Sequence, residues 1–268
     1  MMKIYISADI EGITGTTHWD ETLKDKADYR VFQEQMTDEV VAACEGALNA
    51  GATEIFIKDA HDTGRNLITS QLPEEVKVIR GWSGHPFCMV QELDHTFDAV
   101  VLIGYHSRAG SDTNPLAHSL TSHVDSITLN GILASEFLLH TYAAALVNVP
   151  VVFVSGDAGL CQEVSALNER ITTLAVKSGI GNSTVSIHPK LAVNKTRDLV
   201  EAALKGDIME CKISLAERFT MEIRYKDHSR AYWASYYPGA KRTGTHTVAF
   251  ETLDYFEILR MLLFVANW

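Results

Sequence analysis

Short apolar runs alternate with longer amphipathic segments through the first half of the chain. The runs are rich in β-branched residues and lie at residues 4–7, 53–58, 76–79, 99–103 and 149–155. Runs of this length with few polar positions are typical of strands that are buried on both faces. Because the runs are separated by segments of helical periodicity, the pattern predicts a mainly parallel sheet with crossover helices, which is an α/β fold of three layers.

Apolar residues recur at helical spacing in two of the intervening segments. The first segment covers residues 36–48, with Thr37 in a position to cap its start and Gly51 where a C-terminal cap belongs. The second covers residues 133–147 and follows a short predicted strand at 126–129. Both segments are predicted to be helices.

The pattern changes in the last third of the chain. Residues 211–225 mix alternation with charge, residues 232–237 are aromatic, and residues 253–265 again show helical spacing. We therefore expect an α/β domain over residues 1–190 and a smaller α+β domain over residues 191–268. The aromatic segment is expected to form core inside the smaller domain more readily than an interface.

Composition places the chain among ordinary globular proteins. Apolar residues make up 46% of the 268 residues and charged residues 21%. No apolar run approaches the roughly 18 residues that a membrane-spanning helix needs, and the strand-like start leaves no room for a signal peptide. A net charge of −11 disfavours binding to nucleic-acid phosphates. We expect a cytoplasmic protein with neither membrane nor nucleic acid as a partner.

The cysteines support the same expectation. Cys44, Cys88, Cys161 and Cys211 are widely spaced and form no CxxC pair. Such cysteines are typical of reduced, mostly buried thiols and not of a disulfide framework. We expect them to take no part in the chemistry of the protein.

Two carboxylates lie at the carboxyl end of the first predicted strand. Asp9 and Glu11 are two residues apart, so strand geometry places them on one side. In open α/β sheets ligands bind outside the carboxyl ends of the strands, where this pair is placed to hold a cation. Gly12 and Gly15 follow and let the backbone turn away. By itself, the pair is equally consistent with solvated loop acids.

Two later predicted strands end in histidine at the same edge. His61 follows the strand at 53–58, and His106 follows the strand at 99–103. A single histidine after a strand is more often a loop or core residue, but two of them beside an Asp-x-Glu pair indicate a metal site. Imidazole and carboxylate without thiolate suit zinc, cobalt or manganese, and zinc is the expected ion.

Two further residues are candidates for the same site. Glu136 lies in an apolar stretch beside Phe137 and Leu138, where a carboxylate is costly to bury unless it is paired or metal-bound. The alternative for Glu136 is a first-turn acid favoured by the helix dipole. His118 lies in a polar loop that is able to cover the site.

Four motifs together closely resemble those of the bacterial zinc D-aminopeptidase family associated with dipeptide-permease operons. They are Ser-x-Asp-x-Glu-Gly at 7–12, Lys-Asp-x-His-Asp at 58–62, Gly-Tyr-His at 104–106 and Asn-Gly-x-x-x-Ser-Glu at 130–136. The resemblance runs along nearly the whole chain, and the set is far more specific than any one motif. It implies a large α/β domain that carries the metal site, a smaller α+β domain, and a homodecamer of two stacked pentamers.

The resemblance also implies roles for the candidate residues. Asp9 would bridge two Zn²⁺ ions per subunit, with Glu11 and His61 as ligands of one ion. His106 and Glu136 would bind the other ion, and His118 matches the catalytic histidine of the family. The implied activity is the release of N-terminal residues, above all D-residues, from short peptides by metal-activated hydroxide.

Two other interpretations of the same residues remain open. A dinuclear hydrolase of another class, such as a phosphoesterase, uses the same ligand types but needs basic groups, and only Lys58, Arg65 and Arg108 lie near the motifs. A non-catalytic peptide-binding assembly protein is the third interpretation, and five intact ligands argue against it.

Overall fold

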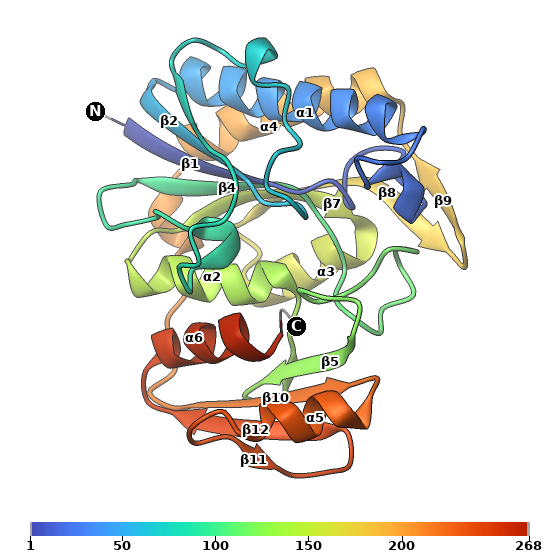
Figure 1. Cartoon of the computed structure of the whole chain (residues 1–268). Coiled ribbons are helices and arrows are strands. Elements are labelled where there is room, and N and C mark those ends of the chain that lie inside the picture. Colours follow the sequence, from blue (N-terminus) through green and yellow to red (C-terminus); the bar gives the residue numbers. More distant parts are fainter. Residues whose placement is uncertain (1, 267–268) are drawn as a thin grey trace.

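Two sheets of different kinds make up the computed structural model, which describes residues 2–266 (Figure 1). The larger sheet has the strand order β3-β2-β1-β4-β7-β8-β9 and is parallel apart from β9. Its strands are β1 (Met2–Ala8), β2 (Ala52–Asp59), β3 (Val76–Ile79), β4 (Ala99–Tyr105), β7 (Val151–Asp157), β8 (Thr172–Ile180) and β9 (Ser183–Ser186). Because the chain proceeds outward from β1 on one side and from β4 on the other, the strand order reverses between β1 and β4.

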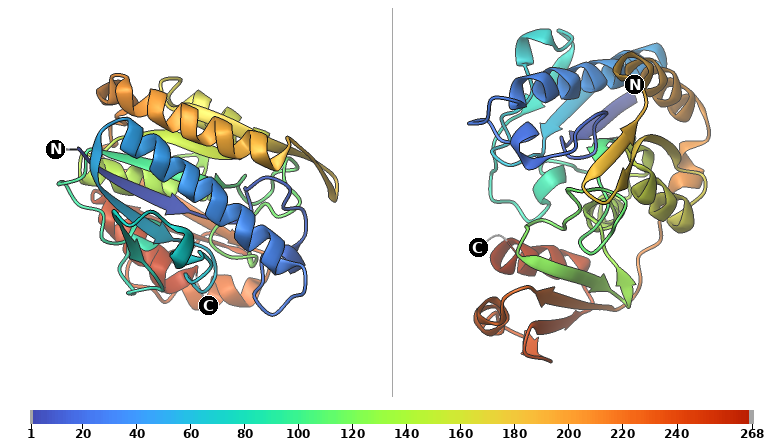
Figure 2. Two further views of the ribbon diagram at one scale, coloured as in Figure 1. Left: turned by 90° about the horizontal axis from the view of Figure 1, so that it is seen from above. Right: turned by 90° about the vertical axis from the view of Figure 1, so that its right-hand side faces the viewer.

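Helices cover both faces of the larger sheet. On one face α1 (Tyr29–Asn49) and α4 (Pro189–Lys205) lie side by side, as Figure 2 shows from above. On the other face lie α2 (Glu136–Leu146) and α3 (Ala158–Leu167). Burial from both sides explains the continuous apolar runs of β4, at residues 99–103, and of β7, at residues 151–154. The predicted three-layer α/β arrangement is confirmed.

The smaller sheet is antiparallel and has the strand order β11-β12-β10-β5-β6. Its strands are β5 (Val124–Leu129), β6 (Ile132–Leu133), β10 (Phe219–Tyr225), β11 (Lys241–Arg242) and β12 (Thr247–Thr252), accompanied by α5 (His228–Ala234) and α6 (Tyr255–Val265). Helix α6 joins the two units, because the hydroxyl of Tyr255 donates to the carbonyl of Leu139 in α2 at 2.9 Å. Four short 3-10 helices complete the described elements: η1 (Trp19–Glu21), η2 (Thr69–Gln71), η3 (Cys88–Val90) and η4 (Ile208–Cys211).

The predicted domain boundary at residue 190 does not follow the sheets. Strands β5 and β6 belong to the smaller sheet, because β5 pairs with β10 about a hundred residues later in the register Met221 to Leu129. Helix α4, which the boundary assigned to the smaller domain, packs on α1 in the larger unit. The smaller unit is therefore built from two separate stretches of chain.

The predicted start of the first helix also needs correction. Helix α1 begins at Tyr29 and not near Thr37, whose hydroxyl lies inside the helix and donates to the carbonyl of Gln33 at 2.8 Å. The C-terminal signal was right, because Gly51 follows the helix with φ of +96°.

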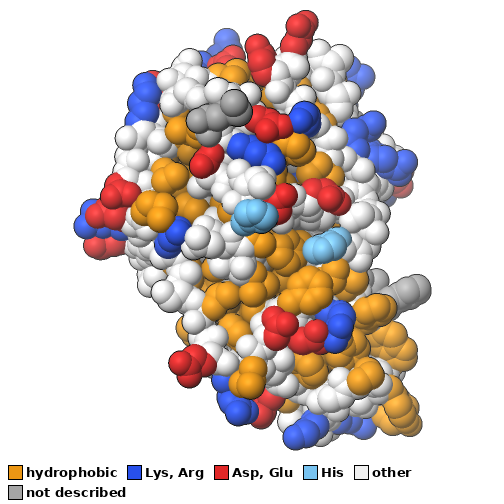
Figure 3. All heavy atoms as spheres, turned by 90° about the vertical axis from the view of Figure 1, so that its left-hand side faces the viewer, with side chains coloured by type: hydrophobic (Ala, Val, Ile, Leu, Met, Phe, Trp, Pro, Cys, Tyr) orange, Lys and Arg blue, Asp and Glu red, His pale blue; other side chains and the backbone are white. Residues whose placement is uncertain are grey.

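Three of the four aromatic side chains at residues 232–237 are exposed, whereas the sequence predicted that this segment forms core. The side chains of Tyr232, Trp233 and Tyr236 are 54%, 48% and 70% exposed. Hydrophobic side chains also gather over the lower half of the face in Figure 3, where the smaller unit lies. The smaller unit thus presents apolar surface to its surroundings.

None of the helices in residues 2–266 is both long enough and apolar enough to span a bilayer. The four cysteines are all free, and three of them, Cys44, Cys161 and Cys211, are buried.

Candidate metal centre

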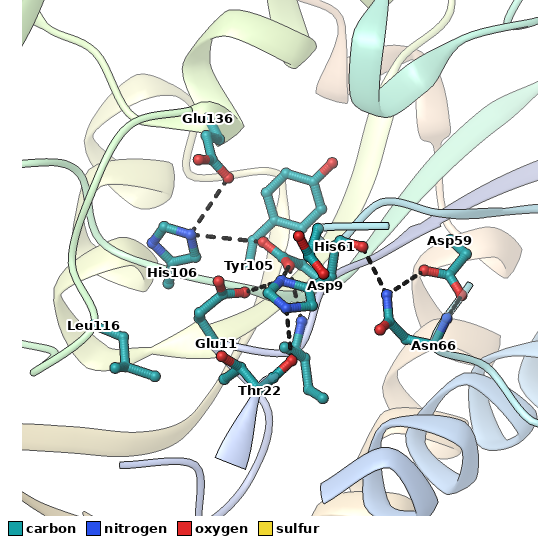
Figure 4. Close-up of polar contacts among 12 residues, drawn as sticks. Asp9, Glu11, Thr22, Asp59, His61, Asn66, Tyr105, His106, Leu116 and Glu136 are labelled. Carbon is teal, nitrogen blue, oxygen red and sulfur yellow. Dashed lines mark hydrogen bonds and ion pairs between the residues drawn. The ribbon is translucent and has the colours of Figure 1, made fainter. Parts of the chain in front are cut away.

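Five buried side chains meet at the carboxyl edge of the larger sheet, where the strand order reverses (Figure 4). Asp9 and Glu11 follow β1, His61 follows β2, His106 follows β4, and Glu136 begins α2 from the adjacent layer. None of the five is more than 6% exposed. The structure therefore brings together all five residues that the sequence predicted as ligands.

The carboxylate of Asp9 stands between two groups of ligand atoms. Its Oδ1 lies 3.3 Å from Nδ1 of His61, which is 2.9 Å from Oε2 of Glu11. Its Oδ2 lies 3.6 Å from Nε2 of His106, which is 3.3 Å from Oε2 of Glu136. The ligand atoms form two triads that share Asp9, each with all its atoms within 4.8 Å of one another.

The outer ring nitrogen of each histidine is held by the main chain. Nε2 of His61 lies 3.0 Å from the carbonyl of Thr22, and Nδ1 of His106 lies 2.9 Å from the carbonyl of Ser107. A carbonyl only accepts, so these outer nitrogens carry a hydrogen, and the inner nitrogen of each ring is the one that a cation would bind once the ring is neutral. Nε2 of His106 is fully buried and has no hydrogen-bond partner. A divalent cation fits this donor set and would satisfy that nitrogen.

The charges of the cluster are strongly coupled when no cation is present. Burial opposes charge on His106, yet the Glu136 carboxylate raises the pKa of His106 to about 10. Burial likewise opposes charge on Glu136, but His106 lowers the pKa of Glu136 to about 2. Glu11 raises the pKa of His61 well above its usual value in spite of burial. Protonated imidazoles thus balance the carboxylates in the place where metal cations would do so.

His118 lies against this cluster from the loop between β4 and β5. Its ring stacks on that of His106 with centroids 4.3 Å apart, and the ring of Trp19 contacts it edge-on at 5.4 Å. Nδ1 of His118 lies 2.9 Å from the carbonyl of Leu116, and Nε2 lies 3.6 Å from Oε1 of Glu136. Burial, followed by the charge of His106, lowers the pKa of His118. The expected catalytic histidine is therefore neutral and adjacent to both triads.

A cavity of about 560 Å³ opens above the carboxylates. Its walls include Trp19, Trp82 and Leu263, and its inner end is formed by the metal-site residues. Cys88 also lines the cavity, and the expectation that the cysteines take no part in the chemistry stays a prediction. Burial raises the pKa of the Cys88 thiol to about 12, so the thiol is neutral at physiological pH.

The loop after β1 touches the carboxyl end of β4 directly beneath the site. The amide of Gly12 donates to the carbonyl of Gly104 at 2.8 Å, and a Cβ at Gly12 would stand 1.7 Å from the carbonyl oxygen of Tyr105. The sequence suggested that Gly12 allows a turn. The structure shows instead that Gly12 allows the close approach of the loop to β4. Of the two glycines, only Gly15 has a positive φ, of +87°.

Sequence reasoning missed the polar residues that hold the ligands from behind. The main examples are Asn66, Asn114, Asp157 and Lys177, which are at most 3% exposed. Asp157 ends β7, and its place at a strand end was the one signal in the sequence. The others lie in a loop or on a strand, where burial alone reveals their role.

Buried carboxylates and imidazoles at the reversal point of a parallel sheet define a site for divalent metals of the kind used by metallohydrolases. The chain matches the M55 peptidase family model, described as D-aminopeptidase, over residues 2–264. It is 33% identical to a D-aminopeptidase of Bacillus subtilis (strain 168) over 266 residues, which cover 98% of this chain and 96% of the relative. The chain belongs to the D-aminopeptidase family.

A solved structure agrees with this assignment. The Zn-dependent D-aminopeptidase DppA from Bacillus subtilis, described as a self-compartmentalizing protease, superimposes with a TM-score of 0.94 at 30% identity. The match covers 99% of this chain and 97% of that chain. The family resemblance drawn from the four motifs is confirmed, and so is the expected enzyme class, an aminopeptidase.

Proposed function

We propose that this enzyme releases the N-terminal residue, preferentially a D-residue, from short peptides at a centre of two zinc ions. The ligands would be Asp9, Glu11, His61, His106 and Glu136. The observation that carries the proposal is that the two oxygens of Asp9 face histidines of two different triads. Zinc is supported by the donor set and by the zinc dependence of the structural relative.

Zinc ions held by these residues would supply Lewis acidity, which activates water and polarises the scissile carbonyl. The protein's own groups handle the protons. Neutral His118 accepts the proton of the attacking water at Nε2 and returns it to the leaving nitrogen, because its Nδ1 hydrogen is engaged by Leu116. His106 and Trp19 hold the imidazole in place from either side.

The cavity explains why the enzyme would act on chain ends. The metal-site residues that line it are at most 6% exposed, so a peptide would reach them with a terminus first. The free α-amine would sit against one ion among the carboxylates, which restricts cleavage to the first residue. The preference for D-residues is supported by membership in the family.

We propose further that the protein is cytoplasmic and forms a homodecamer of two stacked pentamers. Free cysteines support a reducing compartment. The relative with a solved structure is described as self-compartmentalizing, and the exposed side chains of Trp233, Tyr236 and Phe264 offer apolar surface for subunit contacts. Sedimentation or light scattering of the purified protein would give the number of subunits.

One experiment separates this function from its rivals. The purified protein is analysed for metal and then assayed on D-Ala-D-Ala, on L-Ala p-nitroanilide and on a phosphate monoester. We expect about two zinc ions per chain and turnover of the peptide. Turnover of the phosphate ester alone would favour a phosphoesterase, although no lysine or arginine of the described chain lines the cavity. A metal-containing protein without any turnover would favour a binding protein.

A further inference from the structure

Two asparagine–aspartate pairs lie behind the metal ligands. In the first pair, Nδ2 of Asn66 donates to Oδ1 of Asp59 at 2.8 Å and to the carbonyl of His61 at 2.7 Å (Figure 4). Asp59 ends β2 and also accepts from the amides of Asn66 and Leu67. The pair is fully buried. It therefore fixes the backbone of one ligand, His61, and contacts no other ligand.

The second pair repeats this design at a different place. Nδ2 of Asn114 donates to Oδ2 of Asp157 at 3.1 Å and to the carbonyl of Glu11 at 3.2 Å. Asp157 ends β7, just as Asp59 ends β2. Asn114 is 3% exposed and Asp157 is fully buried. The second pair therefore fixes the backbone of Glu11.

Unlike the first pair, the pair of Asn114 and Asp157 is also connected to His106, a proposed ligand in the other triad. Oδ2 of Asp157 accepts from the amide of Ser107 at 2.7 Å, and the hydroxyl of Ser107 also donates to Asp157. The carbonyl of Ser107 in turn orients the ring of His106. One carboxylate is thus connected to Glu11 through Asn114 and to His106 through Ser107.

Lys177 on β8 also holds the carbonyl of Glu11, the group that accepts from Asn114. Its Nζ donates to the carbonyl of Glu11 at 2.5 Å and to the carbonyl of Thr16. The side chain is 3% exposed, and a buried ammonium is costly unless it is hydrogen-bonded. Both of its bonds are made to the loop that carries Glu11. The ammonium therefore pins that loop to the strand beside β7.

We propose that the network of Asn114, Asp157 and Lys177 sets the spacing between the two metal-binding triads, whereas the Asn66 pair orients His61 alone. The inference rests on the two-ion centre proposed above. Its residues act through the ligands and are positioning residues. Groups that orient metal ligands typically contribute 10–100-fold to metal affinity or activity.

The test compares the same substitution in the two pairs. Asn114→Asp keeps the shape and the oxygen that accepts from the amide of Leu116 at 2.9 Å, but it places an acceptor against Asp157 and the Glu11 carbonyl. Asn66→Asp makes the same change in the other pair and is the matched control. The metal-free proteins are titrated with Co²⁺, and magnetic coupling between the two cobalt ions is measured by electron paramagnetic resonance. Zinc affinities are measured separately by competition with a chelator.

We expect two coupled cobalt ions in the wild type. Asn66→Asp should lower the affinity for one of the two zinc ions by about 10–100-fold. The magnetic coupling between the cobalt ions should be retained when cobalt is saturating. Asn114→Asp should show weakened coupling even at saturation, because the triads have moved apart. Wild-type coupling in Asn114→Asp, or the same behaviour in both variants, would overturn the inference. A wild type that binds a single ion would refute the two-ion centre, and the inference with it.

Lys177→Met removes the other hydrogen bond to the carbonyl of Glu11 without adding a negative charge, and it is a second test of the inference. Circular dichroism first establishes that the variant is folded. Weakened cobalt coupling in folded Lys177→Met supports the inference, and unchanged coupling contradicts it. If neither Asn114→Asp nor Lys177→Met folds, the network serves the fold and not the spacing of the ions, and the inference is also wrong.

Discussion

His118 has a position that allows two different roles. Its Nε2 lies near Glu136, and its ligand atom falls within 4.8 Å of those of Glu11 and His106. A residue at this place is able to transfer protons or to bind metal. The stacked ring of His106 and the edge contact of Trp19 fix the imidazole in either case.

Replacing His118 separates the two roles. We expect His118→Ala to retain both zinc ions and to lose about 10²–10⁴-fold in kcat, which is the usual effect of removing a general acid or base. Metal content by mass spectrometry and steady-state kinetics measure the two quantities. Loss of zinc from the variant would make His118 a ligand and displace one of the five proposed residues.

The raised histidine pKa values predict proton release on metal binding. With a pKa of about 10, His106 is protonated at pH 7 in the metal-free protein, and zinc binds only the neutral imidazole. Zinc binding at pH 7 should therefore release protons, and affinity should fall as pH is lowered. Calorimetric titrations in buffers of different ionisation enthalpy measure the release. Binding enthalpies that do not depend on the buffer would show that the imidazoles were neutral already.

The proposed ligands were predictable at the residue scale, whereas the residues that hold them in place were not. Asp9, Glu11 and His61 are ligand-type residues directly after apolar runs, so their position follows from the strand pattern. Asn114 and Lys177 look like ordinary polar residues in sequence, and their function depends on burial against carbonyl groups of distant segments. No local pattern encodes such a contact.

At the scale of elements, the parallel strands were predictable because burial on both faces leaves a continuous apolar run. The start of α1 was misplaced because Tyr29 is the only buried residue among its first seven, so the regular apolar spacing begins only at Met36. The membership of β5 in the smaller sheet was not predictable, since its partner β10 lies far along the chain. Pairing partners are decided by tertiary packing.

The contact between the loop after β1 and the end of β4 makes a prediction at this scale. Gly12→Ala would place a Cβ against the Tyr105 carbonyl, so the loop that carries the first carboxylates must move. We expect a loss of about 1–3 kcal/mol in the free energy of unfolding, together with weaker zinc binding. Gly206→Ala is the control, because its Cβ would lie 3.4 Å from the nearest atom. Equal thermal stability of the two variants would contradict this view of Gly12.

At the scale of the whole molecule, we expect the cavity and the proposed assembly together to set the substrate range. We expect D-Ala-D-Ala to be cleaved with a higher kcat/KM than L-Ala-L-Ala, and a long unfolded peptide to be cleaved slowly. The first expectation follows from the family, and the second from a cavity of only about 560 Å³ and from the proposed decamer, in which the active sites would face an inner chamber. A preference for the L-dipeptide would refute the stereochemical proposal and leave the aminopeptidase in place. Rapid digestion of long chains would argue against a chamber.

The central claim is that one carboxylate, Asp9, serves both metal ions. The most direct test is the zinc content and activity of Asp9→Ala, compared with the wild type and with Asp62→Ala, an acid of the cavity wall outside both triads. The wild type and Asp62→Ala should contain about two zinc ions per chain, whereas Asp9→Ala should lose zinc from both positions together with its activity, because a bridging ligand is shared. An Asp9→Ala enzyme that keeps two zinc ions and a near-normal rate would contradict the account.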